Sequence, residues 1–296
     1  MAIVDLILDT DIGDDVDDAL ALAFALQSPE VNLRAVTTVH GEVETRARLA
    51  LKVLHTFGRD DVPVASGTAK PLFRPRPTHR PNQAVVLDSE EKLPAPWPGH
   101  AVDLIIETVM NSPGEVVICP VGAQTNLALA LAKEPRLVEK ARIVFMGGVF
   151  SRMQAEYNIA CDPEAARLVV ESGIPLTMVG LDVTLKCRLT TNQVDALGAS
   201  DLPSARLLAD LIAAWRGPRN ITPTLHDPLA IAVTFDPSLV ALEPRLLRVE
   251  TQGAHTRGFT LATPSDQPNA QVCTDVEAER FVQLFFQRVS APPARI

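Results

Sequence analysis

The 296-residue sequence lacks several features that mark large classes of protein. It has no run of basic residues, and its 27 Lys and Arg against 36 Asp and Glu leave a net charge of −9. This charge disfavours nucleic acids and anionic membrane surfaces as partners. No uninterrupted apolar stretch reaches the roughly 18 residues that a membrane-spanning helix needs. The sequence therefore predicts neither a nucleic-acid partner nor a membrane partner.

Paired cysteines and an N-terminal targeting segment are also absent. The four cysteines are far apart and form no CxxC pair: Cys119, Cys161, Cys187 and Cys273. This pattern is typical of a reduced protein without a zinc ribbon. The first residues, "MAIVDLILDTD", have no basic segment followed by a long apolar one, so they indicate a first strand instead of a signal peptide. We expect a cytoplasmic protein.

Short β-branched segments alternate with Ala- and Leu-rich segments along the chain. Examples are "VDLIL" before "DDALALAFALQS", "EVVICPV" before "TNLALALAKE" and "RIVFMGG" before "DPEAARLVVESG". This alternation predicts an α/β fold with an open, mostly parallel, twisted sheet flanked by helices, as in Rossmann-like proteins. In such sheets ligands bind beyond the carboxyl ends of the strands. Candidate site residues are therefore those that follow the strands.

Residues 1–296 show no repeat and no clear boundary, so we expect one domain. Residues 66–100 are rich in proline and charge and have neither helical nor strand periodicity, which predicts a long surface loop or lid. Near the C-terminus, "LLRVETQG", "RGFTLAT" and "NAQVCTDV" predict a short antiparallel meander, and "EAERFVQLFFQRV" predicts a closing helix.

The stretch "DTDIGDDVDD" at residues 9–18 holds six aspartates in ten positions. One or two carboxylates there could cap a helix or interact with its dipole, each contributing roughly 0.3–1 kcal/mol. Six carboxylates repel one another and need a cation. Oxygen ligands without a nearby His or Cys favour Ca²⁺ or Mg²⁺ over zinc. An EF-hand is excluded because, with Asp9 as position 1, Gly13 falls at position 5 and Leu20 at position 12.

Two later strand ends also carry polar residues. Residues 122–126 form a turn into a helix, which offers backbone carbonyls and the Thr125 side chain, although a Thr-Asn pair there could simply cap the helix. Glu156 and Asn158 follow a Gly-Gly break and are two apart in an extended stretch, so both side chains face the same side. Such a pair could bind vicinal hydroxyls, or it could be satisfied by the loop backbone.

A fourth strand end is "TPTLHDPLAIAVTF", where His226 and Asp227 precede an apolar helix. By themselves these residues also fit a surface histidine and a helix N-cap.

Together, and in this order, the four stretches resemble the inosine-uridine-preferring nucleoside hydrolase family from Ile3 to about Pro237. The resemblance implies hydrolysis of the N-glycosidic bond of ribonucleosides to ribose and free base. It also implies a Ca²⁺ ion at the bottom of the pocket. The implied ligands are the carboxylates of Asp11, Asp18 and Asp227 and the backbone carbonyl of Thr125.

The resemblance further implies roles in catalysis. Asp11 would remove a proton from the attacking water, and His226 would protonate the departing base. Asp17, Glu156 and Asn158 would hold the sugar. A homodimer or homotetramer is also implied.

The sequence departs from the family pattern in four places. The loop between the Gly-Gly break and Glu156 is shorter than usual and lacks a Gly-Asn pair associated with the 5′ side of the sugar. The acidic motif is two residues longer than DxDxGxDDA, so Asp15 could replace Asp17 or Asp18 in the metal shell. Glu42 stands where the family has an asparagine after the second strand, so it could accept hydrogen bonds from the sugar hydroxyls or add charge next to the metal. The lid motif HG-x-x-GLG is absent from "THRPNQAVVLDSEE", where His79 could partly substitute. The base pocket depends on residues 66–100 and on the segment before His226, where the candidates are Trp215, Arg216 and Arg219.

Two other functions fit part of the pattern. A haloacid-dehalogenase-like Mg²⁺ phosphohydrolase would use Asp9 as nucleophile and Asp11 as acid and base. A relative that binds ribosyl ligands without turnover would keep the metal and ribose sites.

Overall fold

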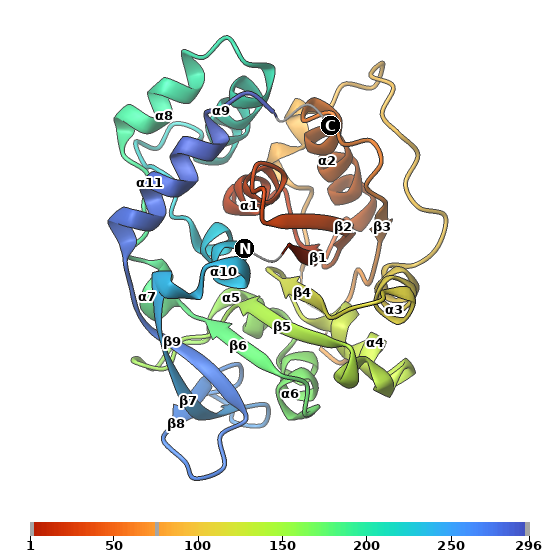
Figure 1. The fold of residues 1–296 in the computed structure, drawn as a ribbon, viewed down its shortest axis with the longest axis vertical. Helices are drawn as coiled ribbons and strands as arrows, with labels where there is room; N and C mark the ends of the chain where they lie inside the picture. Colours follow the sequence, from red (N-terminus) through yellow and green to blue (C-terminus); the bar gives the residue numbers. More distant parts are fainter. Residues whose placement is uncertain (1–2, 75–76, 294–296) are drawn as a thin grey trace.

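The computed structural model describes residues 3–74 and 77–293. Its strands are, in chain order, β1 (Val4–Thr10), β2 (Val31–Thr38), β3 (Val64–Ser66), β4 (Val116–Pro120), β5 (Ala141–Met146), β6 (Leu176–Val179), β7 (Val240–Val249), β8 (Thr260–Thr263) and β9 (Ala270–Val276). They form a single sheet in the order β3-β2-β1-β4-β5-β6-β9-β7-β8 (Figure 1). All neighbouring pairs from β3 to β6 are parallel, which confirms the predicted fold class.

Helices cover both faces of this sheet. The α-helices are α1 (Asp17–Leu26), α2 (Val43–Thr56), α3 (Ala101–Asn111), α4 (Thr125–Lys133), α5 (Tyr157–Cys161), α6 (Pro163–Glu171), α7 (Leu181–Thr184), α8 (Thr191–Gly198), α9 (Pro203–Arg216), α10 (His226–Phe235) and α11 (Ala278–Val289). Helices α1, α2, α9, α10 and α11 pack on one face, and α3, α4 and α6 on the other. In the parts of the chain that the structure describes, no helix combines the length and apolar character needed to cross a membrane.

Strand β1 shows why the strands are continuous apolar runs. Leu6 and Leu8 pack into one core cluster and Ile7 into the other, and all three side chains are fully buried. A strand covered on both faces has no solvent side on which polar residues would alternate. Polar residues therefore begin where the strand ends, at the carboxyl edge of the sheet.

The C-terminal strands are antiparallel as predicted, but their order is not that of a simple meander. Strand β9 lies between β6 and β7, parallel to β6 and antiparallel to β7, while β8 pairs with the other side of β7. Val272 and Cys273 of β9 are both fully buried, so this strand needs cover on both faces. Leu261 of β8 is about half exposed, which suits the edge of the sheet.

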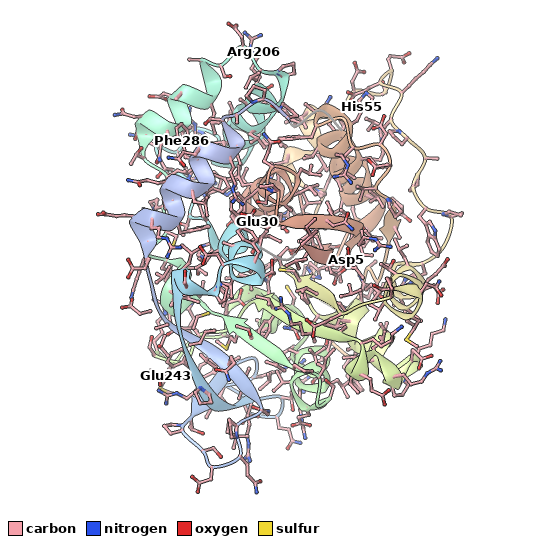
Figure 2. The ribbon with its side chains drawn as sticks, in the orientation of Figure 1. Asp5, Glu30, His55, Arg206, Glu243 and Phe286 are labelled. Atoms are coloured by element: carbon pink, nitrogen blue, oxygen red, sulfur yellow. The ribbon has the colours of Figure 1, made fainter. Side chains whose placement is uncertain are left out.

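Helix α11 closes the chain against α1, as the sequence predicts for a closing helix. The Arg288 guanidinium donates from Nη2 to Glu30 Oε1 (2.8 Å) and lies over the rings of Phe24 and Phe235. Glu30 is labelled in Figure 2, together with surface residues such as Arg206.

The segment predicted as a loop or lid contains, among its described residues, one short 3₁₀ helix, η1 (Asn82–Val86). Gln83 donates from its backbone N to Gly13 O (3.1 Å) and from Nε2 to Asp15 O (2.7 Å). Gly13 has φ of +125°, and a Cβ there would lie 2.6 Å from Pro81 Cβ. Only glycine therefore lets this segment pack against the acidic turn.

Candidate active site

A pocket of about 490 Å³ opens among the loops that follow the strands. Eight of the ten predicted site residues line it: Asp11, Asp15, Asp17, Asp18, Glu156, Asn158, His226 and Asp227. Asp11 and Glu156 follow β1 and β5, two strands of one sheet. The expected fourth strand end is wrong: His226 and Asp227 begin α10, which follows helix α9 and not a strand of the sheet. These two residues reach the site because α10 packs against α1.

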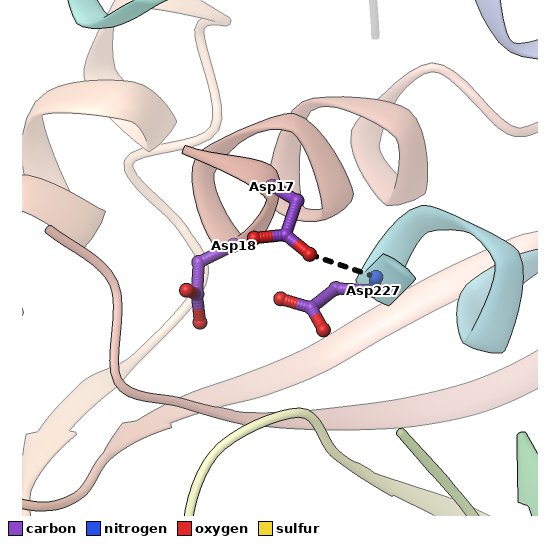
Figure 3. A group of neighbouring side chains, drawn as sticks. All are labelled: Asp17, Asp18 and Asp227. Carbon is purple, nitrogen blue, oxygen red and sulfur yellow. Dashed lines mark hydrogen bonds between the residues drawn. The ribbon is translucent and has the colours of Figure 1, made fainter. Parts of the chain in front are cut away.

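Three carboxylates form the centre of the pocket. One oxygen each from Asp17, Asp18 and Asp227 lies within 4.8 Å of the other two (Figure 3). Asp17 and Asp18 begin α1, Asp227 is in the first turn of α10, and each residue is at most 4% exposed. The backbone N of Asp227 donates to Asp17 Oδ2 (3.2 Å), which joins the two helix N-termini.

The electrostatics of this centre favour a bound cation. Burial raises the pKa of Asp17, Asp18 and Asp227 well above the usual range, and the repulsion between neighbouring carboxylates raises each pKa further. Helix N-termini offset only part of this cost. A divalent cation would let all three groups ionise, and carboxylate oxygens are the ligands that hard cations prefer. The residues present therefore fit a metal ion.

Asp11 and Asp15 lie beside this centre. Asp11 is 5% exposed, and burial raises its pKa to about 6 although the nearby Arg46 opposes the shift. Asp15 Oδ1 accepts a hydrogen bond from Val16 N (2.7 Å), and burial raises its pKa as well. Asp15 lines the pocket, whereas the three-carboxylate cluster is formed by Asp17 and Asp18 with Asp227.

A buried arginine holds the acidic turn of residues 9–18 by hydrogen bonds. Arg46, in α2, is 1% exposed. Its Nη1 donates to the backbone oxygens of Asp11 and Ile12, its Nε donates to His40 O (2.6 Å), and its Nη2 donates to Asp14 Oδ2 (2.7 Å). One guanidinium thus ties the end of β1 to the end of β2.

Sequence analysis missed Arg46, although the sequence contains a relevant pattern. Arg46 is three and seven residues before Leu49 and Val53, so it lies on the buried face of the helix. A charged residue on an apolar helical face needs a buried partner. Gln154 and Tyr157, which also line the pocket, were missed as well, and neither belongs to a distinctive pattern.

Glu156 and Asn158 form a polar wall. Glu156 Oε1 accepts from Asn158 N (2.8 Å) and Oε2 accepts from Gly148 N (3.0 Å), so the carboxylate caps α5. Asn158 Nδ2 donates to Val121 O (2.7 Å). The two residues are satisfied by backbone groups, as one interpretation of the sequence expects, and both also line the pocket. Binding of vicinal hydroxyls remains a prediction.

The structure does not place Thr125 and Glu42 at the pocket. Thr125 is 2% exposed, its Oγ1 donates to Asp162 Oδ2 (2.7 Å), and it is not a lining residue. Val121, from the same strand end, does line the pocket. Glu42 is exposed beside α2, where its Oε2 accepts from Thr45 Oγ1 (2.9 Å).

His226 lines the pocket as the first residue of α10. Its Nδ1 lies 2.7 Å from Thr184 Oγ1. Burial, with a smaller effect from the positive charge of Arg188, lowers the His226 pKa to about 4. The imidazole is therefore neutral at pH 7.

The rest of the lining comes from α9 and from the segment around η1. Trp215, Arg219, His79 and Asn82 line the pocket, whereas Arg216 does not. His79 Nε2 lies 3.1 Å from Asp14 Oδ1, which brings the segment predicted as a lid to the acidic turn.

The fold and the site define an α/β protein with a metal-binding acidic pocket beyond its parallel strands. The chain belongs to the inosine-uridine preferring nucleoside hydrolase family, whose model matches residues 6–283. The family predicted from the sequence is thereby confirmed, together with its enzyme class, nucleoside N-glycosyl hydrolases. Membership implies a metal-dependent enzyme, and the acidic cluster agrees with this.

Individual relatives show the same likeness over nearly the whole chain. The pyrimidine-specific ribonucleoside hydrolase RihA of Salmonella agona (strain SL483) is 36% identical over 313 residues, which cover 96% of this chain and 97% of that protein. A plant nucleoside hydrolase, the PpNRh1 enzyme, has a similar structure with a TM-score of 0.87 at 30% identity, covering 98% of this chain and 99% of that one. The purine-preferring ribonucleoside hydrolase from Gardnerella vaginalis has a TM-score of 0.85 at 32% identity, covering 97% and 98% of the two chains.

Proposed function

We propose that this protein is a Ca²⁺-dependent ribonucleoside hydrolase that cleaves the N-glycosidic bond and releases ribose and free base. The observation that carries this proposal is the buried cluster of Asp17, Asp18 and Asp227 within a pocket that also contains the polar wall of Glu156 and Asn158. A metal centre beside hydroxyl-binding groups suits a ribose whose C1′–N bond is to be broken.

Asp18 and Asp227, with Asp11 beside them, would hold the ion. Asp17 belongs to the same cluster and would reach the ribose diol. Ca²⁺ accepts six to eight oxygen ligands in flexible geometry, which suits carboxylates from two helix N-termini better than the strict octahedron of Mg²⁺. When bound, the ion would orient a water molecule and the ribose hydroxyls and would lower the pKa of that water.

Asp11 would take the proton of the attacking water. The Asp11 side chain lines the pocket beside the acidic cluster, where its carboxylate can accept that proton. Glu156 and Asn158 are fixed by backbone groups and would hold sugar hydroxyls without reorganisation. Together these groups favour the positively charged, oxocarbenium-like ribosyl group in the transition state.

His226 would donate a hydrogen bond to the departing base, which then takes up its proton from solvent. When the Thr184 hydroxyl donates to Nδ1, the neutral imidazole carries its proton on Nε2, which is then free to donate. The short contact to Thr184 also fixes the orientation of the ring.

The test is ribose release from a panel of purine and pyrimidine ribonucleosides, with added calcium and after removal of metal by a chelator. We expect release that stops on chelation and returns with Ca²⁺. No release from any nucleoside by a protein that binds Ca²⁺ would contradict the proposal and favour a relative that only binds ribosyl ligands.

The phosphohydrolase alternative is not favoured. Asp9, its required nucleophile, is fully buried and does not line the pocket. Its Oδ1 accepts from Thr37 Oγ1 (2.6 Å) and Asn126 Nδ2 (2.8 Å), so it braces neighbouring strand ends. A hydrolysis assay with p-nitrophenyl phosphate checks this point.

A further inference from the structure

The backbone of the acidic turn is held by two segments that are distant from it in the sequence. Arg46 Nη1 donates to the backbone oxygens of Asp11 and Ile12. Gln83, in η1, donates to the second half of the turn: its backbone N to Gly13 O (3.1 Å) and its Nε2 to Asp15 O (2.7 Å). The turn that leads into the carboxylate cluster therefore depends on a residue 68 positions beyond Asp15.

The contact between η1 and the turn is closely packed. Gln83 is fully buried, and η1 packs against α2 and α9. A Cβ at Gly13 would lie 2.6 Å from Pro81 Cβ, so the two backbones meet with no room for a side chain. Asn82 Nδ2 reaches Asp14 O (3.4 Å). Donors from η1 thus reach the backbone oxygens of three consecutive residues, 13–15.

This contact accounts for the length of the acidic motif. The chain has three residues between Gly13 and Asp17, two more than DxDxGxDDA contains. Asp14 and Asp15 lie in this longer stretch, and their backbone oxygens are two of the three acceptors for η1. Asp17 and Asp18 of the carboxylate cluster follow directly. The added residues therefore link the cluster to η1.

Stability alone does not explain a glutamine at position 83. The Asp15 carbonyl oxygen can only accept, so the NH₂ group of the Gln83 amide must face it. Gln83 Oε1 then has no hydrogen-bond partner among the described residues, although it is buried. A buried amide oxygen without a partner costs free energy of folding, which an apolar side chain of similar length would avoid. A cost of this kind is typical of residues that serve a functional site.

We propose that Gln83 is a positioning residue for the metal centre: it fixes the backbone that presents Asp15, Asp17 and Asp18, and it couples Ca²⁺ binding to the contact between η1 and the acidic turn. This inference rests on the proposed function, which supplies the ion. The coupling is reciprocal, so the contact raises Ca²⁺ affinity and bound Ca²⁺ strengthens the contact by the same factor. Asn82 of η1 lines the pocket, so the same coupling positions part of the pocket wall.

The first test is calorimetric Ca²⁺ titration of Gln83→Met after removal of metal by a chelator. Methionine has a similar length and removes both the Nε2 donor and the unpartnered Oε1. We expect Ca²⁺ affinity to fall roughly tenfold, as for other groups that orient metal ligands. The Tm in chelator should stay close to that of the wild type, because the lost hydrogen bond is offset by removal of the buried oxygen.

A second variant guards against an effect of methionine itself. Gln83→Asn keeps the amide but shortens the side chain by one methylene, so it no longer reaches Asp15 O. It should lose Ca²⁺ affinity to the same extent as Gln83→Met.

Gln27→Met is the matched control. Gln27 also donates from Nε2 to backbone oxygens, those of Arg288 (3.1 Å) and Ala291 (2.9 Å). It follows the other end of α1 and is not among the described residues that line the pocket. This variant should lose thermal stability and bind Ca²⁺ within about twofold of the wild type.

Hydrogen exchange measures the coupling from the other side. Peptides that contain η1 report on the Gln83 amide, which donates to Gly13 O. In the wild type, saturating Ca²⁺ should slow exchange of this amide by the factor that the titration gives, roughly tenfold. In Gln83→Met the effect of Ca²⁺ on these peptides should be much smaller.

Unchanged Ca²⁺ affinity in Gln83→Met would overturn the inference. Equal losses of affinity in Gln83→Met and Gln27→Met would also overturn it, since general destabilisation would explain both. So would exchange of the η1 peptides that responds to Ca²⁺ equally in the wild type and in Gln83→Met. A wild-type protein that binds no Ca²⁺ would instead refute the proposed function, on which this inference depends.

Discussion

The guanidinium of Arg46, which does not itself line the pocket, donates to the backbone carbonyl of Asp11, which does. The Asp11 side chain is thus available to the pocket, while the hydrogen bond from Arg46 fixes the Asp11 backbone. Hydrogen bonding of this kind fixes a pocket carboxylate before any ligand arrives, which lowers the cost of ordering it later.

Substituting Arg46→Lys tests this clamp while keeping the charge. A lysine ammonium cannot donate at once to the four oxygens that the guanidinium reaches, so the acidic turn should loosen. We expect Ca²⁺ affinity to fall roughly tenfold and kcat to fall at least as much, as for other residues that support metal ligands. Calorimetric Ca²⁺ titration and steady-state kinetics measure the two effects.

A suitable control is Arg288→Lys, because Arg288 is also a largely buried arginine with a carboxylate partner, Glu30. It lies on α11 and does not line the pocket. This variant should lose thermal stability and keep the Ca²⁺ affinity of the wild type. If Arg46→Lys behaved in the same way, Arg46 would have a purely structural role.

The pKa shifts predict how pH and calcium act together on stability. Burial raises the pKa of Asp9 to about 7 and that of Asp11 to about 6, from 3.8. As pH rises, these two carboxyl groups therefore ionise at lower pH in the unfolded chain than in the metal-free folded protein. The stability that their raised pKa values contribute is fully present below pH 4 and is lost as pH rises through 6 and 7. Bound Ca²⁺ should favour the ionised form of Asp11, which lines the pocket, and so reverse that residue's share of the loss.

We therefore expect calcium to raise Tm little at pH 5 and increasingly toward pH 8. Thermal unfolding in chelator and in calcium, over a series of buffers, gives this difference directly. A calcium-dependent rise in Tm that stays constant from pH 5 to 8 would show that these carboxylates do not take part in the linkage.

The Thr125 side chain should matter for folding more than for metal binding. Thr125→Val removes the hydrogen bond to Asp162 Oδ2 and leaves the backbone carbonyl in place. We expect a loss of about 1–3 kcal/mol in the free energy of unfolding, because a buried carboxylate loses a donor. Calcium affinity should stay within a factor of about two of the wild type. A selective loss of calcium binding would place the Thr125 hydroxyl at the metal.

Glu42 and Glu156 offer a direct comparison. Glu42 is exposed and outside the pocket, so Glu42→Gln should change kcat/KM by less than about twofold. Glu156→Gln replaces an acceptor oxygen of a carboxylate that caps α5, so KM for nucleosides should rise clearly. Steady-state kinetics of both variants on one nucleoside measure kcat/KM and KM. A large fall in kcat/KM for Glu42→Gln would mean that Glu42 contacts the sugar in the bound state.

The sequence determined the alternation of strands and helices, because strands covered on both faces must be apolar throughout, as Leu6, Ile7 and Leu8 of β1 are. The number and spacing of the six aspartates were also enough to predict a cation site at the acidic turn. Their position after a strand was enough to place them at the carboxyl edge.

Tertiary structure decided which oxygens converge. Asp227 joins Asp17 and Asp18 because α10 begins beside α1, a distance that no local pattern specifies. Local patterns likewise do not specify that Thr125 Oγ1 donates a hydrogen bond to Asp162, or that β9 pairs with β6. Local sequence specifies secondary-structure propensity and burial, whereas contacts between distant segments depend on how the whole sheet assembles. The sequence alone therefore indicated the chemistry of the site, and the tertiary structure determined which residues form it.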